Sequence, residues 1–354
     1  MLKNITNIYD GTHQTPKYTK SGVPFMSVED VTQKSSKEQK YISEQDFQND
    51  FHNPPQKGDI LMTRIGDIGT PCIVPTNEAL GYYVSLALIR PLEKLQSCFL
   101  NYVIQSNSFK RELYKRTIHV AFPQKINKED IGKCKLDVPS IEEQSRIGDL
   151  LSLIDERIET QKKIIEKCES LIRGLYHSCF CNSENTIIKL RDVVAIVKGK
   201  QVNGENLLEN GQYYVMNGGI EPSGYLNEYN TPADTISISE GGNSCGYVQY
   251  NKEPFWSGGH CYSLMPKSDN ICYRFLYHFL KYKENDIMAL RIGSGLPNVQ
   301  KKDLERFEVQ LPSLERQREV TTLLDAISAK LDLERQLHHV WQSQKQYLLG
   351  SLFI

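Results

Sequence analysis

Residues 138–144 read VPSIEEQ, and residues 311–317 repeat this element as LPSLERQ. An apolar helical pattern follows both copies, and the two patterns align without a gap. Ser140 followed three residues later by Glu143 is typical of a capping box, and Pro139 favours an extended backbone just before the helix. The element therefore predicts that a long helix begins at two equivalent places in the chain.

The repeat extends outward from this element over the whole chain. The parallel landmarks are Leu2, Ile5, Ile8 and Gly11 with Leu190, Val193, Ile196 and Gly199; Arg90-Pro91 with Met265-Pro266; Phe99, Leu100 and Val103 with Phe275, Leu276 and Phe279; and Pro123 with Pro297. Repeats this long are not those of stacked solenoids. The sequence of 354 residues therefore predicts two copies of one unit: globular residues 1–139 with helix 140–184, and globular residues 185–312 with helix 313–354.

Each globular unit is predicted to mix strands and helices. Short runs rich in Val, Ile, Tyr and Thr are bounded by Gly, Pro, Asn and Asp, which is typical of strands. Examples are Asp59–Ile65, Tyr82–Ile89, Asp234–Ser239 and Gly246–Tyr250. Shorter helical patterns lie at Phe99–Gln105 and Tyr273–Tyr282. The expected fold class is α+β, with two mixed, strand-rich domains.

The first long helix carries a heptad pattern. Its seam positions are Leu151, Ile154, Ile158, Gln161, Ile165, Cys168, Ile172 and Leu175, of which Gln161 alone is an amide. Steps of three and four residues sustained this long predict a coiled coil. At ~1.5 Å per residue, a helix from Glu142 to Cys179 is roughly 55 Å long.

The second long helix has a less regular seam. Leu324, Ile327 and Leu331 follow the same register, and the apolar pattern then shifts toward Leu337, Val340, Trp341 and Leu348. Glu334 and His338 fall where the first helix has Gln161 and Ile165. Neither helix is expected to leave this stripe in water, so we expect them to pair antiparallel within one molecule, as a spacer between the two domains related by a pseudo-twofold axis. A parallel homodimer is the competing arrangement.

Composition limits the possible classes of protein. No stretch approaches the ~18 apolar residues of a membrane span, and the N-terminal residues lack the apolar core of a signal peptide, so we expect a cytoplasmic protein without a membrane partner. The nine cysteines are scattered, and Cys179 and Cys181 lack zinc or redox spacing. We expect reduced cysteines and no metal site.

Net charge neither predicts nor excludes nucleic-acid binding. Residues 1–139 carry 18 Lys and Arg against 15 Asp and Glu, which gives +3, whereas the other three segments are neutral or acidic. Any contact with phosphates must therefore come from local clusters rather than from a basic surface.

Several local patterns together resemble a known family. They are YDGTHQTPKY at residues 9–18, GVPF at 22–25, GGN at 241–243, FWSGGHC at 255–261, GSGLPN at 293–298, and the repeated PS-x-E-x-Q element. In this order, and with a long helix after each unit, they resemble the specificity subunit of type I restriction-modification enzymes over essentially the full chain. Each globular unit then resembles a target recognition domain.

The resemblance implies a protein that reads a two-part sequence in double-stranded DNA, one half with each domain, across a gap set by the helices. It implies that methyltransferase subunits and restriction subunits are the protein partners, and we expect two methyltransferase subunits. S-adenosylmethionine, ATP and Mg²⁺ would bind those partners, and no cofactor is expected in this chain.

Candidate DNA contacts come from loops of both units. They are His13, Lys17, Arg64, Lys198, Lys200, Asn243, Trp256, His260, Arg291 and Ser294. Each has a plainer alternative: Arg64 can pair with Asp67, Lys198 and Lys200 can flank an ordinary turn at Gly199, and Trp256 and His260 can simply pack. Arg291, beside the flexible turn at residues 293–295, is the strongest candidate of the second unit.

No catalytic residue is predicted. The segment Asn53-Pro54-Pro55-Gln56 is similar to the catalytic loop of adenine methyltransferases, but Gln56 lacks the aromatic face that stacks on a flipped base. Loops for a methyl donor or for a nucleotide phosphate are not found. A self-sufficient adenine methyltransferase, the recognition subunit of a related type IIB-like system, and a coiled-coil adaptor for proteins remain as alternatives.

Overall fold

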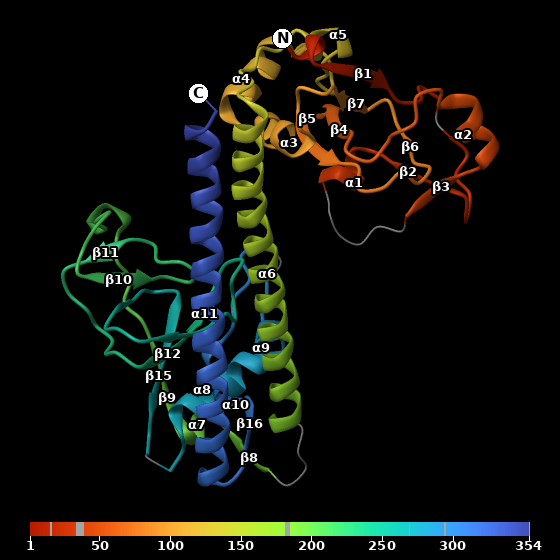
Figure 1. Ribbon diagram of the computed structural model, residues 1–354. Coiled ribbons are helices and arrows are strands. Elements are labelled where there is room, and N and C mark those ends of the chain that lie inside the picture. The colour runs from red at the N-terminus through yellow and green to blue at the C-terminus, as the bar shows by residue number, and fades with distance from the viewer. Residues whose placement is uncertain (15, 33–38, 181–184, 269, 294, 354) are drawn as a thin grey trace. The chain divides into compact units, whose positions relative to one another are not determined.

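The computed structural model describes residues 1–354 except 15, 33–38, 181–184, 269, 294 and 354 (Figure 1). The chain divides into two compact units: unit 1 contains residues 1–162 and 336–354, and unit 2 contains residues 163–335. The two long helices, α6 (Ile141–Phe180) and α11 (Leu314–Ser351), each begin in one unit and end in the other. Each unit therefore combines one globular domain with half of each long helix.

The globular domain of unit 1 contains two sheets. The larger is antiparallel, in the order β1-β7-β4-β5, and the smaller has the order β3-β2-β6, with β2 and β6 parallel. Five successive residues of the central strand β4 are buried, as expected for a strand covered on both faces. The strands are β1 (Thr6–Asp10), β2 (Val23–Met26), β3 (Lys40–Ile42), β4 (Ile60–Ile65), β5 (Asp67–Ile73), β6 (Gly81–Tyr82) and β7 (Leu86–Pro91).

Unit 2 repeats both sheets. Its larger sheet has the order β9-β15-β12-β13, and its smaller sheet has the order β11-β10-β14, again with one parallel pair, β10 with β14. It adds an antiparallel ribbon of β8 and β16. The strands are β8 (Thr186–Lys189), β9 (Val194–Lys198), β10 (Tyr213–Met216), β11 (Tyr225–Leu226), β12 (Thr235–Ser239), β13 (Val248–Asn251), β14 (Trp256–Ser257), β15 (Cys261–Pro266) and β16 (Glu308–Leu311).

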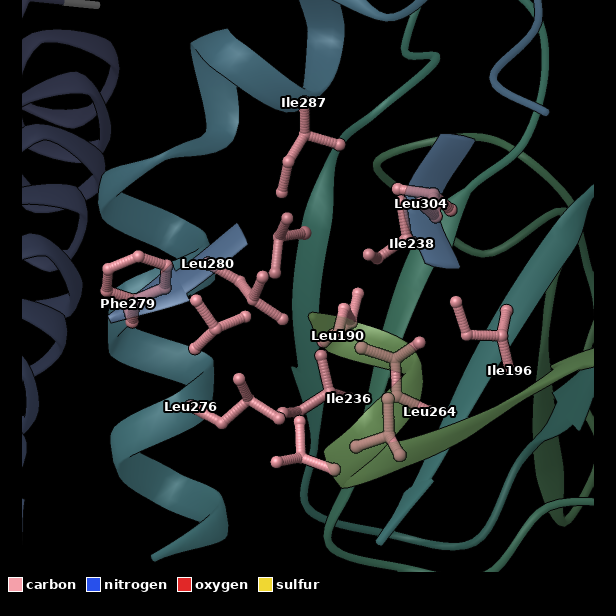
Figure 2. Close-up of a cluster of buried hydrophobic side chains, with 14 of the residues drawn as sticks. Leu190, Ile196, Ile236, Ile238, Leu264, Leu276, Phe279, Leu280, Ile287 and Leu304 are labelled. Atoms are coloured by element: carbon pink, nitrogen blue, oxygen red, sulfur yellow. The ribbon is translucent and has the colours of Figure 1, made fainter. Parts of the chain in front are cut away.

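Short helices cover the larger sheets. In unit 2, Leu276 and Leu280 of α8 point toward Ile236 and Leu264 of the sheet (Figure 2), and Phe279 belongs to the same buried cluster. Spacings of three and four residues place apolar side chains on one helix face. The shorter helices are α1 (Val28–Thr32), α2 (Glu44–Asp50), α3 (Ser97–Gln105), α4 (Asn107–Arg116), α5 (Lys128–Gly132), α7 (Leu190–Val193), α8 (Tyr273–Tyr282), α9 (Glu284–Ala289) and α10 (Lys301–Arg306), with 3-10 turns η1 (Leu2–Asn4) and η2 (Gly204–Asn206).

The predicted α+β class and most predicted elements are confirmed, with one correction among the strands. The run Tyr82–Ile89 is not one strand: β6 ends at Tyr82, and β7 begins at Leu86. The amide of Leu86 donates to the carbonyl of Tyr83 at 2.9 Å, which closes a turn between them. Apolar content alone did not reveal this turn.

The two long helices pair antiparallel in each unit (Figure 1). In unit 1, Leu151 and Leu349 share a buried cluster, and Lys345 Nζ lies 2.7 Å from Asp155 Oδ1. In unit 2, Arg335 Nη2 lies 2.7 Å from Glu169 Oε1. Residue numbers fall along α11 as they rise along α6, so the pairing predicted within one chain is confirmed, and the seam needs no parallel homodimer.

The seam of α6 follows the prediction, whereas the predicted shift along α11 is wrong for Leu337 and Val340 but not for Trp341 and Leu348, which are half-buried. Leu324 and Leu331 are buried, and Ile327 and Leu348 are half-buried, whereas Leu337 and Val340 are exposed. Glu334 is buried in their place and accepts a hydrogen bond from Lys330 Nζ at 2.9 Å. Glu334, a polar side chain with a hydrogen-bond partner, occupies the seam. A pattern that counts only apolar residues therefore placed the seam at the wrong positions.

The repeated PS-x-E-x-Q element fixes the start of each long helix to its domain. The Ser140 hydroxyl accepts from the Glu143 amide at 3.3 Å, and the Ser313 hydroxyl accepts from the Arg316 amide at the same distance. This is the serine half of the predicted capping box. Gln144 and Gln317 are buried and accept hydrogen bonds from the amides of Gln96 and Cys272, each at 2.9 Å.

No helix in the described part of the chain is long and apolar enough to cross a membrane. The eight cysteines outside the gaps in the described ranges are all free thiols, four buried and four half-buried, as predicted. Cys181 lies outside the described residues.

Candidate nucleic-acid interface

One end of the larger sheet gathers several loops in unit 1. The amide of Thr12, just after β1, donates to the carbonyl of Tyr82 at 3.2 Å, and the amide of Arg64 donates to the carbonyl of Ser85 at 2.9 Å. Gly11 makes this approach possible, because a Cβ there would lie 2.5 Å from the Tyr82 carbonyl oxygen. The ends of β1, β4 and β6 therefore meet on a shared backbone framework.

Unit 2 repeats this framework with its glycine-rich motif. A Cβ at Gly199 would lie 2.4 Å from the Ser257 carbonyl oxygen, and one at Gly258 would lie 2.6 Å from Asn217 Oδ1. The amide of His260 donates to Asn217 Oδ1 at 3.1 Å, and Trp256 Nε1 donates to the Lys200 carbonyl at 3.0 Å. The motif of residues 255–261 is thus explained by close backbone packing at this end of the sheet.

Each unit carries an ion pair at this sheet end, and the signs are exchanged between the units. In unit 1, Asp10 at the end of β1 lies 3.1 Å from Arg64 Nη1 on β4. In unit 2, Lys198 at the end of β9 lies 2.7 Å from Glu240, which directly follows β12. The first strand of the sheet therefore carries the anion in unit 1 and the cation in unit 2, and the partner position carries the opposite charge.

Strand register shows that these positions are equivalent. Asp10 faces Ala87, which faces Met62, two residues before Arg64. Lys198 faces Tyr262, which faces Ile238, two residues before Glu240. The Arg64 carbonyl accepts from the amide of Ile126, and the Glu240 carbonyl accepts from the amide of Val299, so the next loop attaches at the same place in both units.

Glu240 is the most buried charge of this end of unit 2. Its Oε1 accepts from Lys198 Nζ at 2.7 Å and from the Tyr262 hydroxyl at 2.8 Å, and its Oε2 lies 3.8 Å from His260 Nδ1. Burial, followed by the hydrogen bond to this carboxylate, raises the pKa of Tyr262. Tyr262 thus remains a hydrogen-bond donor at neutral pH.

Most of the predicted contact residues are exposed at loops. His13, Lys17, Lys200, Asn243, His260 and Arg291 are exposed at loops, Lys198 is exposed but paired, and Trp256 is half-buried. Arg64 is 8% exposed, and its Nε donates to the Val84 carbonyl at 2.8 Å. Ser294 lies outside the described residues.

The expected alternative partner of Arg64 is wrong. Asp67 Oδ2 accepts instead from the Thr63 hydroxyl at 2.9 Å, and Arg64 pairs with Asp10. Asp67 is nearer to Arg64 in sequence, but β1 and β4 flank β7 in the sheet, and this brings Asp10 and Arg64 to the same sheet end. The sequence did not identify Asp10, Asn217 and Glu240 as members of this site. The alignment of Gly11 with Gly199 could have shown Asp10, because it makes Asp10 equivalent to the predicted contact residue Lys198.

A loop closes this end of the sheet in each unit. In unit 1 it spans residues 118–125 and is closed by a hydrogen bond from the Ile118 amide to the Lys125 carbonyl at 2.7 Å. In unit 2 it spans residues 292–298 and is closed by the Ile292 amide and the Asn298 carbonyl at 2.9 Å. We call these segments the tip loops. Arg291 directly precedes the second one.

Among the described residues, no group of three or more His, Cys, Asp or Glu side chains is arranged to hold a metal ion. The sheet ends instead offer exposed cations, amides and a paired carboxylate, which are the groups that contact phosphates and base edges in DNA complexes. The arrangement suits recognition of nucleic acid.

Comparisons with known proteins agree with this chemistry. The family model described as "Type I restriction modification DNA specificity domain" matches residues 2–170 and 182–340. A putative type I specificity subunit of Mycoplasma genitalium is 28% identical over 267 residues, which cover 70% of this chain and 68% of that protein. A putative type I restriction enzyme specificity subunit of Methanocaldococcus jannaschii is 24% identical over 337 residues, covering 83% and 77%.

A solved structure has a similar fold. The crystal structure of a type I restriction-modification system S subunit from M. genitalium matches with a TM-score of 0.76 at 21% identity, covering 100% of this chain and 95% of that chain. At this identity the likeness concerns the fold.

Proposed function

The chain belongs to the family of type I restriction-modification DNA specificity subunits, and from this premise we propose that it reads a two-part target in double-stranded DNA, one half-site with each globular domain. In this proposal residues 1–139 and 185–312 are the two recognition domains, and the segments 140–184 and 313–354, which contain α6 and α11, are the spacer. The spacer sets the length of an unread gap between the half-sites.

The sign-exchanged ion pair carries this proposal. Asp10 with Arg64, and Lys198 with Glu240, occupy equivalent positions on the same sheet. Base pairs differ in the donors and acceptors that they present in the major groove. Two domains with one framework and opposite charge placement are therefore suited to two different half-sites, so the target is asymmetric.

Exposed loop residues make the contacts in this proposal. Lys17, Lys200 and Arg291 contact phosphates or guanine edges, and His13, Asn243 and His260 reach base edges. Trp256 supports the loop that contains Lys200, because its Nε1 donates to the Lys200 carbonyl at 3.0 Å. Arg64 positions the loop after β4, because its side chain is already engaged by Asp10 and Val84.

A specificity subunit selects the DNA and leaves the reaction to other chains. We propose that methyltransferase subunits, two per chain, and restriction subunits assemble on this protein, and that S-adenosylmethionine, ATP and Mg²⁺ bind those partners. Since the substrate is DNA, the complex works in the cytoplasm. The Asn53-Pro54-Pro55-Gln56 segment has a structural role: the Pro54 carbonyl accepts from Arg90 Nη2 at 2.8 Å.

A domain exchange tests the proposal. Residues 1–139 are replaced by the corresponding domain of another specificity subunit, and the host methylome is sequenced. We expect one half of the methylated site to change, and the other half and the gap to stay. A methylated site with both halves unchanged would refute it.

The control for catalysis is the purified chain with S-adenosylmethionine and unmethylated DNA that contains the target. We expect no methyl transfer until the methyltransferase subunit is added. Transfer by the chain alone would instead establish a self-sufficient methyltransferase. Absence of sequence-selective protection of DNA by the assembled complex would establish a protein adaptor.

A further inference from the structure

The tip loops carry the most exposed apolar side chains of the described chain. Phe122 and Val120 in unit 1 are 104% and 97% exposed, and Leu296 in unit 2 is 86% exposed. Single exposed apolar residues are ordinary on protein surfaces. Here, however, the three most exposed large apolar residues of the described chain lie on one kind of loop in both repeats.

The residue type at the tip is also repeated. Phe122 is followed by Pro123, and Leu296 is followed by Pro297. The rest of each loop differs, since residues 118–121 read IHVA and residues 292–295 read IGSG. An apolar side chain before a proline is therefore what the two loops share.

The base of each tip loop is held firmly to the sheet. The amide of Gly66 donates to the Gln124 carbonyl at 2.8 Å, and the amide of Gly242 donates to the Pro297 carbonyl at 3.0 Å. These bonds lie directly beside the sign-exchanged ion pairs at Arg64 and Glu240. A firmly attached base lets a loop hold an apolar tip in water without folding it back on its own domain.

Cations stand beside the apolar tips. Lys125 is exposed at the closing pair of the first loop, and Arg291 is exposed immediately before the second. An apolar tip flanked by a cation matches DNA, in which stacked bases lie between rows of phosphates. A purely protein-binding tip would not require the cation in both repeats.

We propose that the tip loops insert Phe122 and Leu296 as apolar wedges between neighbouring base pairs, one wedge in each half-site. This inference rests on the proposed function. Side chains of this type inserted at a base step unstack it and bend the duplex, and the bend allows more protein surface to reach the DNA. Lys125 and Arg291 contact the phosphates beside the opened step.

The wedges add a form of recognition that requires no base-edge contact. Pyrimidine–purine steps such as TA and CA unstack more easily than others. Each half-site is therefore expected to contain such a flexible step at the wedge position, and replacing that step by a stiff one weakens binding without removing any hydrogen bond.

The test uses the full chain with its methyltransferase subunit and a duplex of the target identified by methylome sequencing. 2-Aminopurine replaces one purine at a time in each half-site, excluding the base that is methylated, because methyltransferases flip their target base themselves. We compare wild type with Phe122→Ala, Leu296→Ala and Phe122→Leu. Ile187→Ala, another exposed apolar residue, on β8, is the matched control.

We expect wild type to raise the fluorescence at one step in each half-site. Phe122→Ala removes the rise in the first half-site alone and raises the Kd about tenfold. Leu296→Ala removes the rise in the second alone. Phe122→Leu, which installs the residue of the other unit, retains both signals, and Ile187→Ala leaves them unchanged.

Other outcomes overturn the inference in distinguishable ways. Sequence-selective binding without a fluorescence rise at any step would refute the wedges and leave the proposed function intact. The same holds if Phe122→Ala weakens assembly with the methyltransferase subunit but not the DNA signal, because the tips would then contact protein. A wild-type complex without sequence selectivity would refute the proposed function itself.

Discussion

Gln144 and Gln317 occupy the same position of the repeat, and each is buried where a long helix leaves its domain. Gln144 accepts from the Gln96 amide and donates to the carbonyls of Lys94 and Pro139, at 2.9–3.0 Å. Gln317 accepts from the Cys272 amide and donates to the Pro312 carbonyl, both at 2.9 Å. One side chain thus ties the helix start to the segment that begins α3 or α8.

We expect Gln144→Ala to lower the free energy of unfolding by about 2–4 kcal/mol, because it leaves several buried backbone groups without partners. Gln317→Ala should have a similar effect in unit 2. The measurement is urea unfolding followed by circular dichroism. Gln344→Ala, at an exposed position of α11, should change stability by less than about 0.5 kcal/mol. Equal effects of all three substitutions would contradict this role.

A second pair of equivalent sites has diverged in chemistry. In unit 1, the Tyr102 hydroxyl donates to Asp155 Oδ2 at 2.9 Å, and Cys98 lies against Ser152. In unit 2, buried His278 contacts Asp325 Oδ1 through Nε2 at 2.7 Å, and Arg274 pairs with the same carboxylate. The contact between the domain helix and the long helix became ionic in one copy only.

This divergence gives unit 2 a pH dependence. Burial, more than any other cause, lowers the pKa of His278 below its ordinary value of 6.5, although Asp325 opposes the shift. The unfolded chain therefore binds the proton more readily than the folded chain, and stability is lost as pH falls below about 6.5. Burial raises the pKa of Asp325, but hydrogen bonds from Arg274 and His278 outweigh it, so this carboxylate titrates below 3.8.

We expect the melting temperature to fall between pH 7.5 and 5.5, and His278→Gln to flatten this slope. The glutamine amide can donate to Asp325 but does not titrate. The measurement is differential scanning fluorimetry across this range, which lies above the titration of Asp325. His13→Gln, at an exposed histidine, should leave the slope unchanged. An identical slope in His278→Gln would assign the pH dependence to other groups.

At the scale of elements, each long helix ends with a phenylalanine that packs on a domain helix. Phe180 at the end of α6 lies 5.3 Å from the Phe275 ring and also contacts Phe279 and Tyr282. Phe353, just after α11, lies 5.7 Å from the Phe99 ring. Phe99 and Phe275 are equivalent in the repeat, so both helix ends use the same anchor.

The two anchors differ in burial, and we expect their energies to differ accordingly. Phe180→Ala should cost about 3–5 kcal/mol, since Phe180 is 1% exposed among other rings. Phe353 is only half-buried, so Phe353→Ala should cost about 1–2 kcal/mol. Urea unfolding of both variants measures the difference. A larger loss from Phe353→Ala would contradict the ranking by burial.

Helices and strands could be predicted from sequence where a short stretch of residues was sufficient to determine them. The start of α6 at Ile141 follows from the cap and the proline, and α8 from its apolar spacing. The seam of α11 could not, because Glu334 and Lys345 enter it through partners on the same or the other helix. An apolar count cannot detect such partners.

The candidate site followed the same rule. Exposed loop residues such as His13 and Arg291 were recognisable as loop residues, because glycine and proline mark the turns. The pairing of Arg64 with Asp10 depends on strand order, which places β1 and β4 on either side of β7. Strand order is a long-range property, so the nearer Asp67 was the natural but wrong choice.

At the scale of the whole molecule, the helix register and the repeat define one midpoint. Asp155 pairs with Lys345 in unit 1 and Glu169 pairs with Arg335 in unit 2, so the numbers of facing residues add to about 500 in both units. The two copies of the PS-x-E-x-Q element are offset by 173 residues. The chain passes from one compact unit to the other after residues 162 and 335, which are also 173 residues apart.

This midpoint is the place at which to test the spacer. We expect insertion of one heptad after Lys162 and a second after Arg335 to preserve the seam on both helices, because seven residues return the side chains to nearly the same face. The helices lengthen by ~10.5 Å, and B-DNA rises ~3.4 Å per base pair, so the unread gap should grow by roughly three base pairs. Methylome sequencing of a host carrying this variant measures the gap.

The half-sites themselves should not change, because both recognition domains stay intact. Three base pairs also turn the duplex by nearly a third of a turn, so we expect slower methylation of the longer site. Insertion into α6 alone is the control: it shifts residues such as Glu169 by ~10.5 Å along a partner that has not moved, and should destabilise the chain. A folded, active double insertion that methylates the original gap would show that the paired helices do not set the distance.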